Sequence, residues 1–386
     1  MPLTVNPVSE FDGLNKDLMK YFTLFALLVF TINLPAQVQE RRPGSVSTPR
    51  YIVVDSKDNV FVTLKYGILK ITPDGTVTNI TKQAGIMGPL DKIWRNLIID
   101  SKDNLYANDG KLIYKITVSA DNRAVAKIHA GQEWSYKLED GPIATAGFNT
   151  IHLMTIDRND NIYIADSFDK IKDAVGGNFV TDPYYATVPA KIKGAPNYRV
   201  IRKLDPSGNI TTLKTPNGKY IAPNGVAGMA VDRDGNIIYS SFDRFVAKID
   251  VTTGSFTTVA GQPYKREYCP VYTQGEIAKA ELVNPENIII NKKDEIIFAD
   301  QRIHRVIRIS GGKVSTLAGN NLIQPCSANI GGRAEEGNQD GKALTALFHF
   351  PKGIAYDSKG NLFIADMSNH AIRKLSPDGT VTTFAK

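Results

Sequence analysis

The last segment of the chain holds the residues whose types and spacing most resemble a catalytic group. In FIADMSNHAIRKL (363–375), the residues Asp366, Asn369 and His370 fall within five positions. A carboxylate beside an imidazole can move a proton, and the same residue types can bind a metal ion. Whether the trio is an active site or a structural unit depends on whether this segment is unique in the chain.

The segment belongs to a unit that the chain repeats. An apolar run, an Asp, three polar residues, an Asn and a second apolar run recur as YIVVDSKDNVFV (51–62), NLIIDSKDNLYA (96–107), LMTIDRNDNIYI (153–164), GMAVDRDGNIIY (228–239), NIIINKKDEIIF (287–298) and GIAYDSKGNLFI (353–364). Each copy predicts two strands joined by a tight turn, and third and fourth strand-like runs follow it, such as IRKL and TVTTF in the last copy. Four antiparallel strands in each of six units predict an all-β fold, a six-bladed β-propeller. The blades are expected at about 45–85, 91–133, 140–218, 220–264, 275–320 and 340–386.

The most complete unit, at 351–383, carries the pattern P-x-G-I-A-x-D-x-x-G-N-L-x-x-A-D-x-x-N-H-x-I-R-K-L and closes on P-D-G-x-V-x-T. It resembles an NHL repeat. The chain is thus similar to exported bacterial NHL-repeat proteins and to the NHL region of teneurins, and more distantly to gluconolactonase-like propellers. The resemblance covers about residues 45–386 and implies a single six-bladed propeller.

The N-terminus has the features of a secretory signal. The apolar run YFTLFALLVFTINL (21–34) follows Lys20 and precedes the small residue Ala36. It is too short to span a bilayer, which needs about 20 apolar residues, so cleavage near Ala36 is expected. A buried core segment is the alternative. Residues 1–36 are therefore predicted to be a signal peptide, whose functional start could be Met19, and 37–44 a short N-terminal segment. The mature chain is expected to be secreted or periplasmic, with no stable membrane span.

The Asp of the opening segment recurs at the same position of four units, and an Arg follows in the third strand of three of them. The aspartates are Asp109, Asp166, Asp300 and Asp366, and the arginines are Arg202, Arg308 and Arg373. A catalytic group has no reason to recur in four blades, whereas an Asp–Arg pair or a turn-capping Asp would be needed in each. These residues are predicted to be structural, and His370 is predicted to pack or to form hydrogen bonds.

A ligand site is expected where the inner strands enter the central channel. Five positions before each repeat Asp (or Asn291) stand Arg50, Arg95, His152, Ala227, Glu286 and Lys352. A ring that is mostly cationic would attract an anionic ligand. In the alternative interpretation, Glu286 only neutralises its basic neighbours.

The remaining candidates lie where the repeat is interrupted. The insertion 167–198 in blade 3 carries Phe179, Tyr184 and Tyr185 and is predicted to be either a binding loop or disordered. The long linkers between blades share a sub-motif (DGPIATAGF, QGEIAKAEL, DGKALTALF) that predicts a short helical packing element. Two of these linkers hold the only cysteines, Cys269 and Cys326, at equivalent places. In an oxidising compartment they are expected to form a disulfide, with a free pair or a metal site as alternatives.

These features favour a binding module over an enzyme. The net charge is +7, and for an exported protein a glycan, an anionic small molecule or a protein surface is a more natural partner than nucleic acid. The expected function is a ligand- or protein-binding scaffold that acts through its loop-rich face without a cofactor. The alternative implied by the resemblance is a metal-dependent lactonase or lyase with one divalent metal in the channel. His152 and Glu286, with Asn96 and Asn287 nearby, could then serve the metal, although the surrounding cations oppose it. The chain contains no G-x-S-x-G, H-E-x-x-H or phosphate-loop motif.

Overall fold

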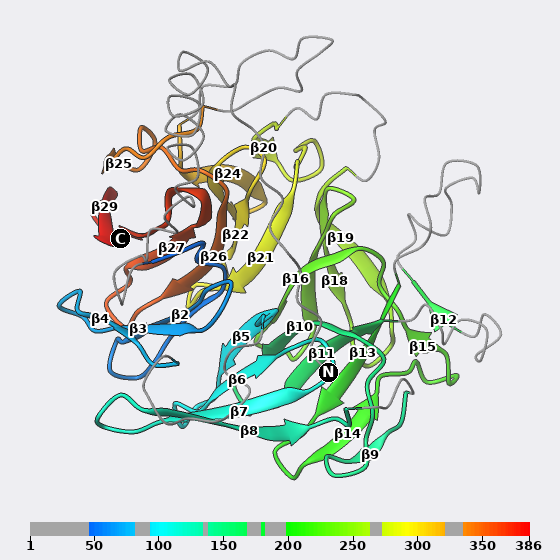
Figure 1. Ribbon diagram of the computed structural model, residues 1–386. Coiled ribbons are helices and arrows are strands. Elements are labelled where there is room, and N and C mark those ends of the chain that lie inside the picture. The colour runs from blue at the N-terminus through cyan, green and yellow to red at the C-terminus, as the bar shows by residue number, and fades with distance from the viewer. Residues whose placement is uncertain are drawn as a thin grey trace, which may run out of the picture. The chain divides into compact units, whose positions relative to one another are not determined.

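The protein is described by a computed structural model, which covers residues 46–81, 93–133, 138–167, 179–181, 198–262, 272–320 and 335–386. These residues all lie in one compact unit, Gly44–Lys386. Six antiparallel sheets follow one another along the chain as six blades (Figure 1). The inner strand of each blade contacts the inner strands of its neighbours, and the strand of blade 1 contacts that of blade 6. The predicted all-β, six-bladed propeller is therefore confirmed.

Each blade is a four-stranded meander, and three blades gain a short fifth strand. The strands of blades 1 to 3 are β1 (Ile52–Val54), β2 (Val60–Thr63), β3 (Ile68–Ile71), β4 (Val77–Asn79); β5 (Asn96–Ile99), β6 (Leu105–Asn108), β7 (Ile113–Val118), β8 (Ala124–Ala130); and β9 (Gly141–Pro142), β10 (Ile151–Ile156), β11 (Ile162–Ser167), β13 (Arg199–Leu204), β14 (Asn209–Thr212). Those of blades 4 to 6 are β16 (Val226–Val231), β17 (Ile237–Ser241), β18 (Phe245–Ile249), β19 (Phe256–Gly261); β20 (Gly275–Glu276), β21 (Pro285–Ile290), β22 (Ile296–Asp300), β23 (Arg305–Ser310), β24 (Lys313–Ala318); and β25 (Gly341–Lys342), β26 (Pro351–Tyr356), β27 (Leu362–Asp366), β28 (Ala371–Leu375), β29 (Thr380–Ala385). A separate two-stranded sheet pairs β12 (Phe179–Val180) with β15 (Tyr220–Ile221).

The linker sub-motif narrows one prediction, because it forms a two-residue edge strand followed by a single turn closed by an i→i+4 hydrogen bond, such as Ala346 N–H to the Lys342 carbonyl, and not a longer helical element. β9, β20 and β25 each pair antiparallel with the outer strand of their own blade. Each begins at a glycine with positive φ, between 125° and 140°, a conformation outside the helical region that L-residues rarely adopt. The apolar residues that looked helical instead follow in a turn whose alanine is buried, for example Ala346.

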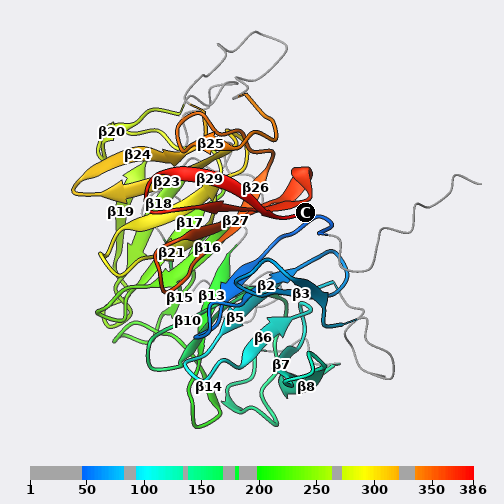
Figure 2. The ribbon, with the colours of Figure 1, turned by 90° about the vertical axis from the view of Figure 1, so that its left-hand side faces the viewer.

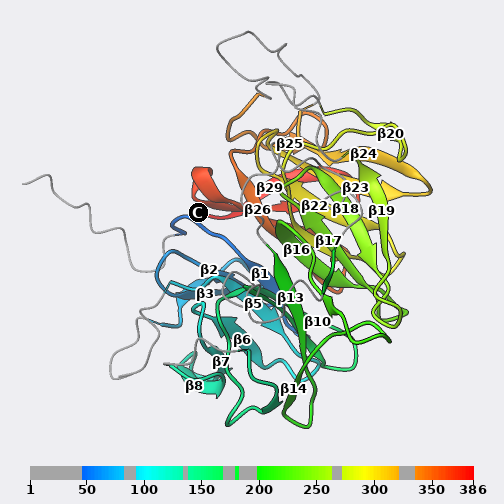
Figure 3. The same ribbon diagram turned by 90° about the vertical axis from the view of Figure 1, so that its right-hand side faces the viewer.

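The core lies between the blades. Six buried apolar clusters correspond to the six contacts between neighbouring blades. The second strands are covered on both faces, and every residue of β2, β11 and β27 is buried. This explains why these strands read as continuous apolar runs and do not alternate between apolar and polar residues. The stacking of blades against each other is seen from two sides in Figures 2 and 3.

The repeated Asp-x-x-x-Asn forms the turn between the first and second strands of a blade, here called the a–b turn. In blade 6 the Asp357 carboxylate accepts the N–H groups of Lys359 (3.0 Å) and Asn361 (2.8 Å) and the Asn361 side-chain amide (2.7 Å). Blade 5 builds the same turn with Asn291 and Glu295 in exchanged roles. The pattern is thus a turn-forming device, which explains why it recurs in every unit.

The propeller closes between blades 6 and 1 without sharing a strand. The Thr48 N–H donates to His370 Nδ1 at 3.0 Å, which ties the start of blade 1 to blade 6. An equivalent bond joins blades 5 and 6, where the Phe350 N–H donates to His304 Nδ1 at 3.1 Å. Gly353 lets the two inner strands approach, since a Cβ there would lie 2.4 Å from the Arg50 carbonyl oxygen. The structure thus places His370 in a hydrogen-bonding role.

Several predictions fall outside the described residues and stay predictions. They are the signal peptide 1–36, the segment 37–44, the residues Tyr184 and Tyr185, and the cysteines Cys269 and Cys326. No helix in the described part of the chain has the length and apolar character needed to span a bilayer.

Candidate functional site

The Asp and Arg of the opening segment meet inside blade 6. Both side chains are fully buried, and Arg373 Nη1 lies 2.9 Å from Asp366 Oδ2. Arg373 Nη2 lies 2.5 Å from Asp340 Oδ1, and the guanidinium also donates to the carbonyl groups of Leu347 and Gln339. The Asp366 carboxylate accepts the His349 N–H at 2.7 Å. This network fastens the incoming linker to the blade, so its groups are engaged in holding the fold.

Blade 3 repeats this arrangement. Arg202 Nη1 lies 3.5 Å from Asp166 Oδ2, and Nη2 lies 3.0 Å from Asp140 Oδ1. Asp109 of blade 2 has no such Arg and instead caps a turn, accepting the N–H groups of Lys111 and Leu112 at 2.9 Å each. Each of these aspartates therefore lies in a local structural role.

Blade 5 does not follow the pattern, and the predicted equivalence of Arg308 with Arg202 and Arg373 is wrong. In blade 6, Arg373 lies opposite Ile364, two residues before the repeat Asp. In blade 5, the residue opposite the corresponding Phe298 is Ile307. Arg308 is one position further on, and because successive strand residues face opposite sides it points away from Asp300. It lies 3.7 Å from Glu295 instead, and its side chain is 40% exposed.

Asp300 is therefore a buried carboxylate that forms no ion pair with Arg308, although the buried Arg305 lies opposite it in β23 and is acted on by its charge. It accepts the N–H groups of Val283 (3.2 Å) and Asn284 (2.9 Å), and backbone groups of Arg302 and Ile303 also stabilise its charged form. Burial raises its pKa to about 6, although these backbone donors act in the opposite direction.

The predicted ring residues gather in two groups at one end of the channel, the end at which the inner strands begin. In the first group, Lys352 Nζ lies 3.1 Å from Glu286 Oε2 and 5.6 Å from the centre of the Tyr51 ring. Asn284 Nδ2 donates to the other oxygen of Glu286 at 3.2 Å. Burial opposes the charge on Lys352, but Tyr51 and Glu286 outweigh it, so the pKa of Lys352 is raised. Arg50 is close enough to act on the same ammonium group.

The second group surrounds His152. Burial, together with the positive charges of Arg199 and Arg95, lowers the pKa of His152 to about 3, so this imidazole is neutral at pH 7. Arg95 lies over Gly110, where a Cβ would meet its Nε at 2.9 Å. Arg199, at the start of β13, is 3% exposed and was missed by the sequence reasoning. Its signal was present, because it follows the blade 3 insertion directly at the channel-mouth end of a strand.

We call Arg50, Arg95, Arg199, Lys352 and Glu286 the channel mouth. Together the two groups hold four cations and one carboxylate, and that carboxylate is already paired with Lys352. The neutral His152 adds a group that can donate or accept a hydrogen bond. The arrangement is suited to holding an anion.

The channel offers a divalent metal few free ligands. The side-chain oxygen of Asn96 accepts the Met154 N–H at 2.8 Å, and that of Asn287 accepts the Ile354 N–H at 3.2 Å. Each asparagine thereby joins its inner strand to the next blade. Within the described residues, no group of three or more His, Cys, Asp or Glu side chains could hold a metal ion. Among the residues that the structure describes, the donor set of the lactonase-like alternative is therefore not assembled.

One cluster outside the channel contains residue types that often bind metals. Its protonation argues against a metal site there. His304 and His349 each place Nε2 at 3.4 Å from Glu336 Oε2. Because His304 Nδ1 accepts the Phe350 N–H, the ring proton must sit on Nε2, which then faces Glu336. A protonated nitrogen cannot ligate a metal, so His304 in this arrangement is not a metal ligand; its hydrogen bond from Phe350 joins blades 5 and 6.

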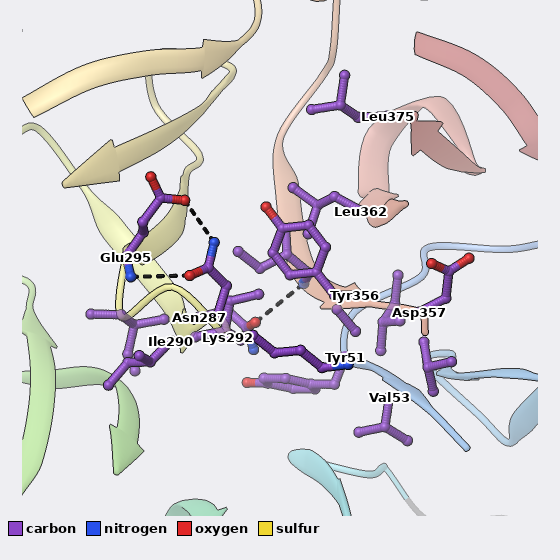
Figure 4. A pocket seen from close by; sticks show the side chains of 18 of the residues that line it. Tyr51, Val53, Asn287, Ile290, Lys292, Glu295, Tyr356, Asp357, Leu362 and Leu375 are labelled. Atoms are coloured by element: carbon purple, nitrogen blue, oxygen red, sulfur yellow. Dashed lines mark hydrogen bonds between the residues drawn. The ribbon is translucent and has the colours of Figure 1, made fainter. Parts of the chain in front are cut away.

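Further along the channel lies a cavity of about 810 Å³. It is lined by the inner strands of all six blades, and Ala227 is the only position of the predicted ring on its wall. The cavity continues between blades 5 and 6 toward their a–b turns, where Lys292, Glu295, Tyr356 and Asp357 surround it (Figure 4). This cavity thus lies beyond the predicted mouth and reaches the a–b turns of the other face.

Of the predicted binding-loop aromatics, only Phe179 is described. Its ring lies 4.9 Å from that of Tyr198, and it packs on a small cluster with Val200 and Ala222. Phe179 is partly buried, so a share of its surface serves packing.

Comparison with known proteins identifies the repeat. The family model of the NHL repeat matches residues 348–375. Protein SUPPRESSOR OF QUENCHING 1, chloroplastic, of Arabidopsis thaliana is 49% identical over 47 residues, which are 12% of this chain and only 4% of that protein.

Two solved structures show the same fold at low sequence identity. An auxiliary nutrient binding protein from Bacteroides thetaiotaomicron VPI-5482 is 16% identical, with 88% of this chain and 69% of that chain covered and a TM-score of 0.55. A second one, from Bacteroides ovatus ATCC 8483, is also 16% identical, with coverages of 88% and 70% and a TM-score of 0.55. The chain is a six-bladed β-propeller whose sixth blade contains an NHL repeat.

Proposed function

We propose that the protein is a non-catalytic binding propeller that holds an anionic ligand at its channel mouth. One observation carries this proposal: Arg50, Arg95, Arg199 and Lys352 lie in two groups at the end of the channel where the inner strands begin, and the single carboxylate among them is already paired. An excess of cations on partly buried walls creates a positive field that draws in and orients an anion.

The arginines of the mouth are the expected anchors. A guanidinium can form two parallel hydrogen bonds to one carboxylate or sulfate group, and such charge-assisted bonds each contribute about 1.5–3 kcal/mol. The Arg50 Nε is buried and has no hydrogen-bond partner among the described residues, so a bound anion would satisfy it. His152, neutral at pH 7, is suited to a ligand hydroxyl. Together these groups favour an acidic sugar or a similar polyhydroxylated anion.

Two further observations support a binding role in an exported protein. The N-terminal sequence has the pattern of a secretory signal. Two similar propellers are described as auxiliary nutrient binding proteins. Metal-dependent chemistry is not favoured, because the channel asparagines and Glu286 are engaged with protein groups. We therefore expect binding without a metal cofactor.

A thermal-shift screen of the mature protein tests the proposal, with acidic oligosaccharides such as trigalacturonate against neutral maltotriose. Stabilisation by the acidic sugar alone, unchanged by a chelator, is expected. The double variant Arg50→Ala/Arg95→Ala should weaken the effect at least about tenfold in ligand concentration, whereas Lys57→Ala, an exposed lysine of an a–b turn, should not. Equal stabilisation by both sugars, or an unchanged response of the double variant, would reject the channel mouth as the site.

A further inference from the structure

Neighbouring a–b turns are joined by a series of side-chain contacts on the face opposite the channel mouth. Ser56 of blade 1 donates from its N–H (2.9 Å) and hydroxyl group (2.6 Å) to Asp103 of blade 2. The same pair of bonds joins Ser101 to Asp160, and Ser358 of blade 6 to Asp58 of blade 1. Blades 3, 4 and 5 are joined by arginines, through Arg158 to the Arg233 carbonyl and through Arg233 to Asp294. Five of the six blade contacts are therefore clasped on this face.

The sixth contact, between blades 5 and 6, lacks this clasp, although the Tyr356 side chain is hydrogen-bonded to Asn291 beside it. The acceptor position of the blade 6 turn holds Gly360, where blades 1, 2, 3 and 5 have an aspartate. Lys292 of blade 5 occupies the donor position. Among the described residues, which include both turns completely, no hydrogen bond or ion pair joins turn 291–295 to turn 357–361.

The cavity opens at this gap. One part of this cavity is lined by Lys292, Glu295 and Arg308 on one side and by Tyr356, Lys359 and Leu375 on the other (Figure 4). We name this part the blade 5–6 groove. Its inner wall is apolar and continues into the core between blades 5 and 6 through Leu362 and Leu375. Charged side chains form its rim, so the groove has the mixed lining that is typical of small-molecule sites.

The charge of the rim is unbalanced. The lining of the cavity holds four basic side chains, Lys292, Lys293, Arg308 and Lys359, and two acidic ones, Glu295 and Asp357. Asp357 accepts three hydrogen bonds from its own turn and keeps its negative charge. Glu295 is held by Asn291 at 2.7 Å and lies 3.7 Å from Arg308. Within the described part of the chain, the ammonium groups of Lys292 and Lys359 form no hydrogen bond or ion pair, although Lys359 is close enough to act on the charge of Asp58. The groove therefore presents two exposed cations beside an apolar wall.

We propose that the blade 5–6 groove is a second binding site, which takes a small organic anion with an apolar body. The apolar part lies against the partly exposed Ile290 and Tyr356, backed by Leu362 and Leu375, and the anionic group lies between Lys292 and Lys359. The site is separate from the channel mouth and does not depend on the function proposed there. It exists because Gly360 removes the carboxylate that would otherwise pair with Lys292 and close the gap.

A matched pair of fluorescent probes tests this assignment. 8-Anilinonaphthalene-1-sulfonate carries an anionic group on an apolar body, and N-phenyl-1-naphthylamine is the same body without the charge. We expect the sulfonate to bind one site per chain and more tightly than the neutral probe. The double variant Lys292→Ala/Lys359→Ala should weaken the sulfonate about tenfold and leave the neutral probe within about twofold, because each exposed ion pair contributes up to about 1 kcal/mol.

Two further variants locate the effect. Gly360→Asp supplies the missing carboxylate; the backbone accepts it, since Gly360 has φ 83° and Asp58 at the same position of blade 1 has φ 63°. A Cβ at Gly360 meets only Pro377, at 3.6 Å. This variant should also weaken the sulfonate severalfold, whereas Lys57→Ala, the blade 1 counterpart of Lys359, should not. Unchanged sulfonate affinity in the double variant, equal losses for both probes, or loss on Arg50→Ala/Arg95→Ala would each overturn the proposal.

Discussion

The sequence presents Arg373 and Arg308 as equivalents. Replacing each of them by methionine should have very different effects on the free energy of unfolding. Methionine keeps an unbranched apolar stem and removes the charge. In blade 6 the Arg373 guanidinium sits over the Phe348 ring, 5.2 Å from its centre. Arg373→Met should therefore remove the polar contacts of the network and the guanidinium–ring contact, while it keeps an apolar side chain of similar length in the same space.

The structure sets the expected cost of each change. Arg373 is fully buried and bonded to Asp366, to Asp340 and to two carbonyl groups. Removing one partner of a buried ion pair costs about 3–5 kcal/mol, because the remaining charge stays buried. Arg308 is 40% exposed and makes one ion pair at 3.7 Å. Its loss should lower the free energy of unfolding by less than about 1 kcal/mol.

The assay is urea unfolding of the two variants and the parent protein at several pH values. Burial already raises the pKa of Asp366, and loss of Arg373 raises it further. The folded variant then holds its proton more tightly than the unfolded chain. The cost of Arg373→Met should consequently be largest at neutral pH and shrink as the pH falls toward the folded pKa, where Asp366 becomes neutral. Equal costs for the two variants, or a cost of Arg373→Met that grows toward acid pH, would refute this account of the network.

Three further predictions concern single residues. Gly353→Ala should lower the free energy of unfolding by about 2 kcal/mol or more, because its Cβ would lie 2.4 Å from the Arg50 carbonyl oxygen at the closure of the ring; a change below about 0.5 kcal/mol would contradict that packing. His152, with a pKa of about 3, should show no titration of its ring resonances between pH 5 and pH 8 in NMR spectra, and a midpoint near 6.5 would place it in water instead. Asp300 has its pKa raised from 3.8 to about 6, so its burial costs about 3 kcal/mol above pH 6 and nothing below pH 4. Asp300→Asn, compared with the parent protein in urea unfolding, should gain relative stability as the pH rises through this window, and a difference independent of pH would count against it.

The sequence is sufficient to predict the blades because every unit contains the same short turn-forming pattern between two apolar runs. Asp357 and Asn361 form a turn within five residues, so the pattern is legible without knowledge of distant contacts. The error at Arg308 arose where the pattern slips by one residue. The sequence does not reveal this one-residue offset. In the paired strands it places the Arg308 side chain on the opposite face of the sheet from the position that Arg373 takes in blade 6.

The blade 5–6 groove could not be predicted from a single unit. Gly360 looks like an ordinary turn residue, and its importance depends on Lys292, which lies in the neighbouring blade. The interblade clasps join residues 47 to 300 positions apart. Likewise, the sequence placed the channel-mouth residues at equivalent strand positions, but it could not show that Glu286 pairs with Lys352 or that Arg199 adds a fourth cation.

The central claim is that the channel mouth binds anions through its excess of positive charge. Titration calorimetry of the purified mature protein with trigalacturonate, at low and at high salt, tests it most directly. The account predicts one site per chain, an affinity that falls as salt increases, and a loss of at least about tenfold in Arg50→Ala/Arg95→Ala. Salt-independent binding, or binding that survives loss of both arginines, would contradict it.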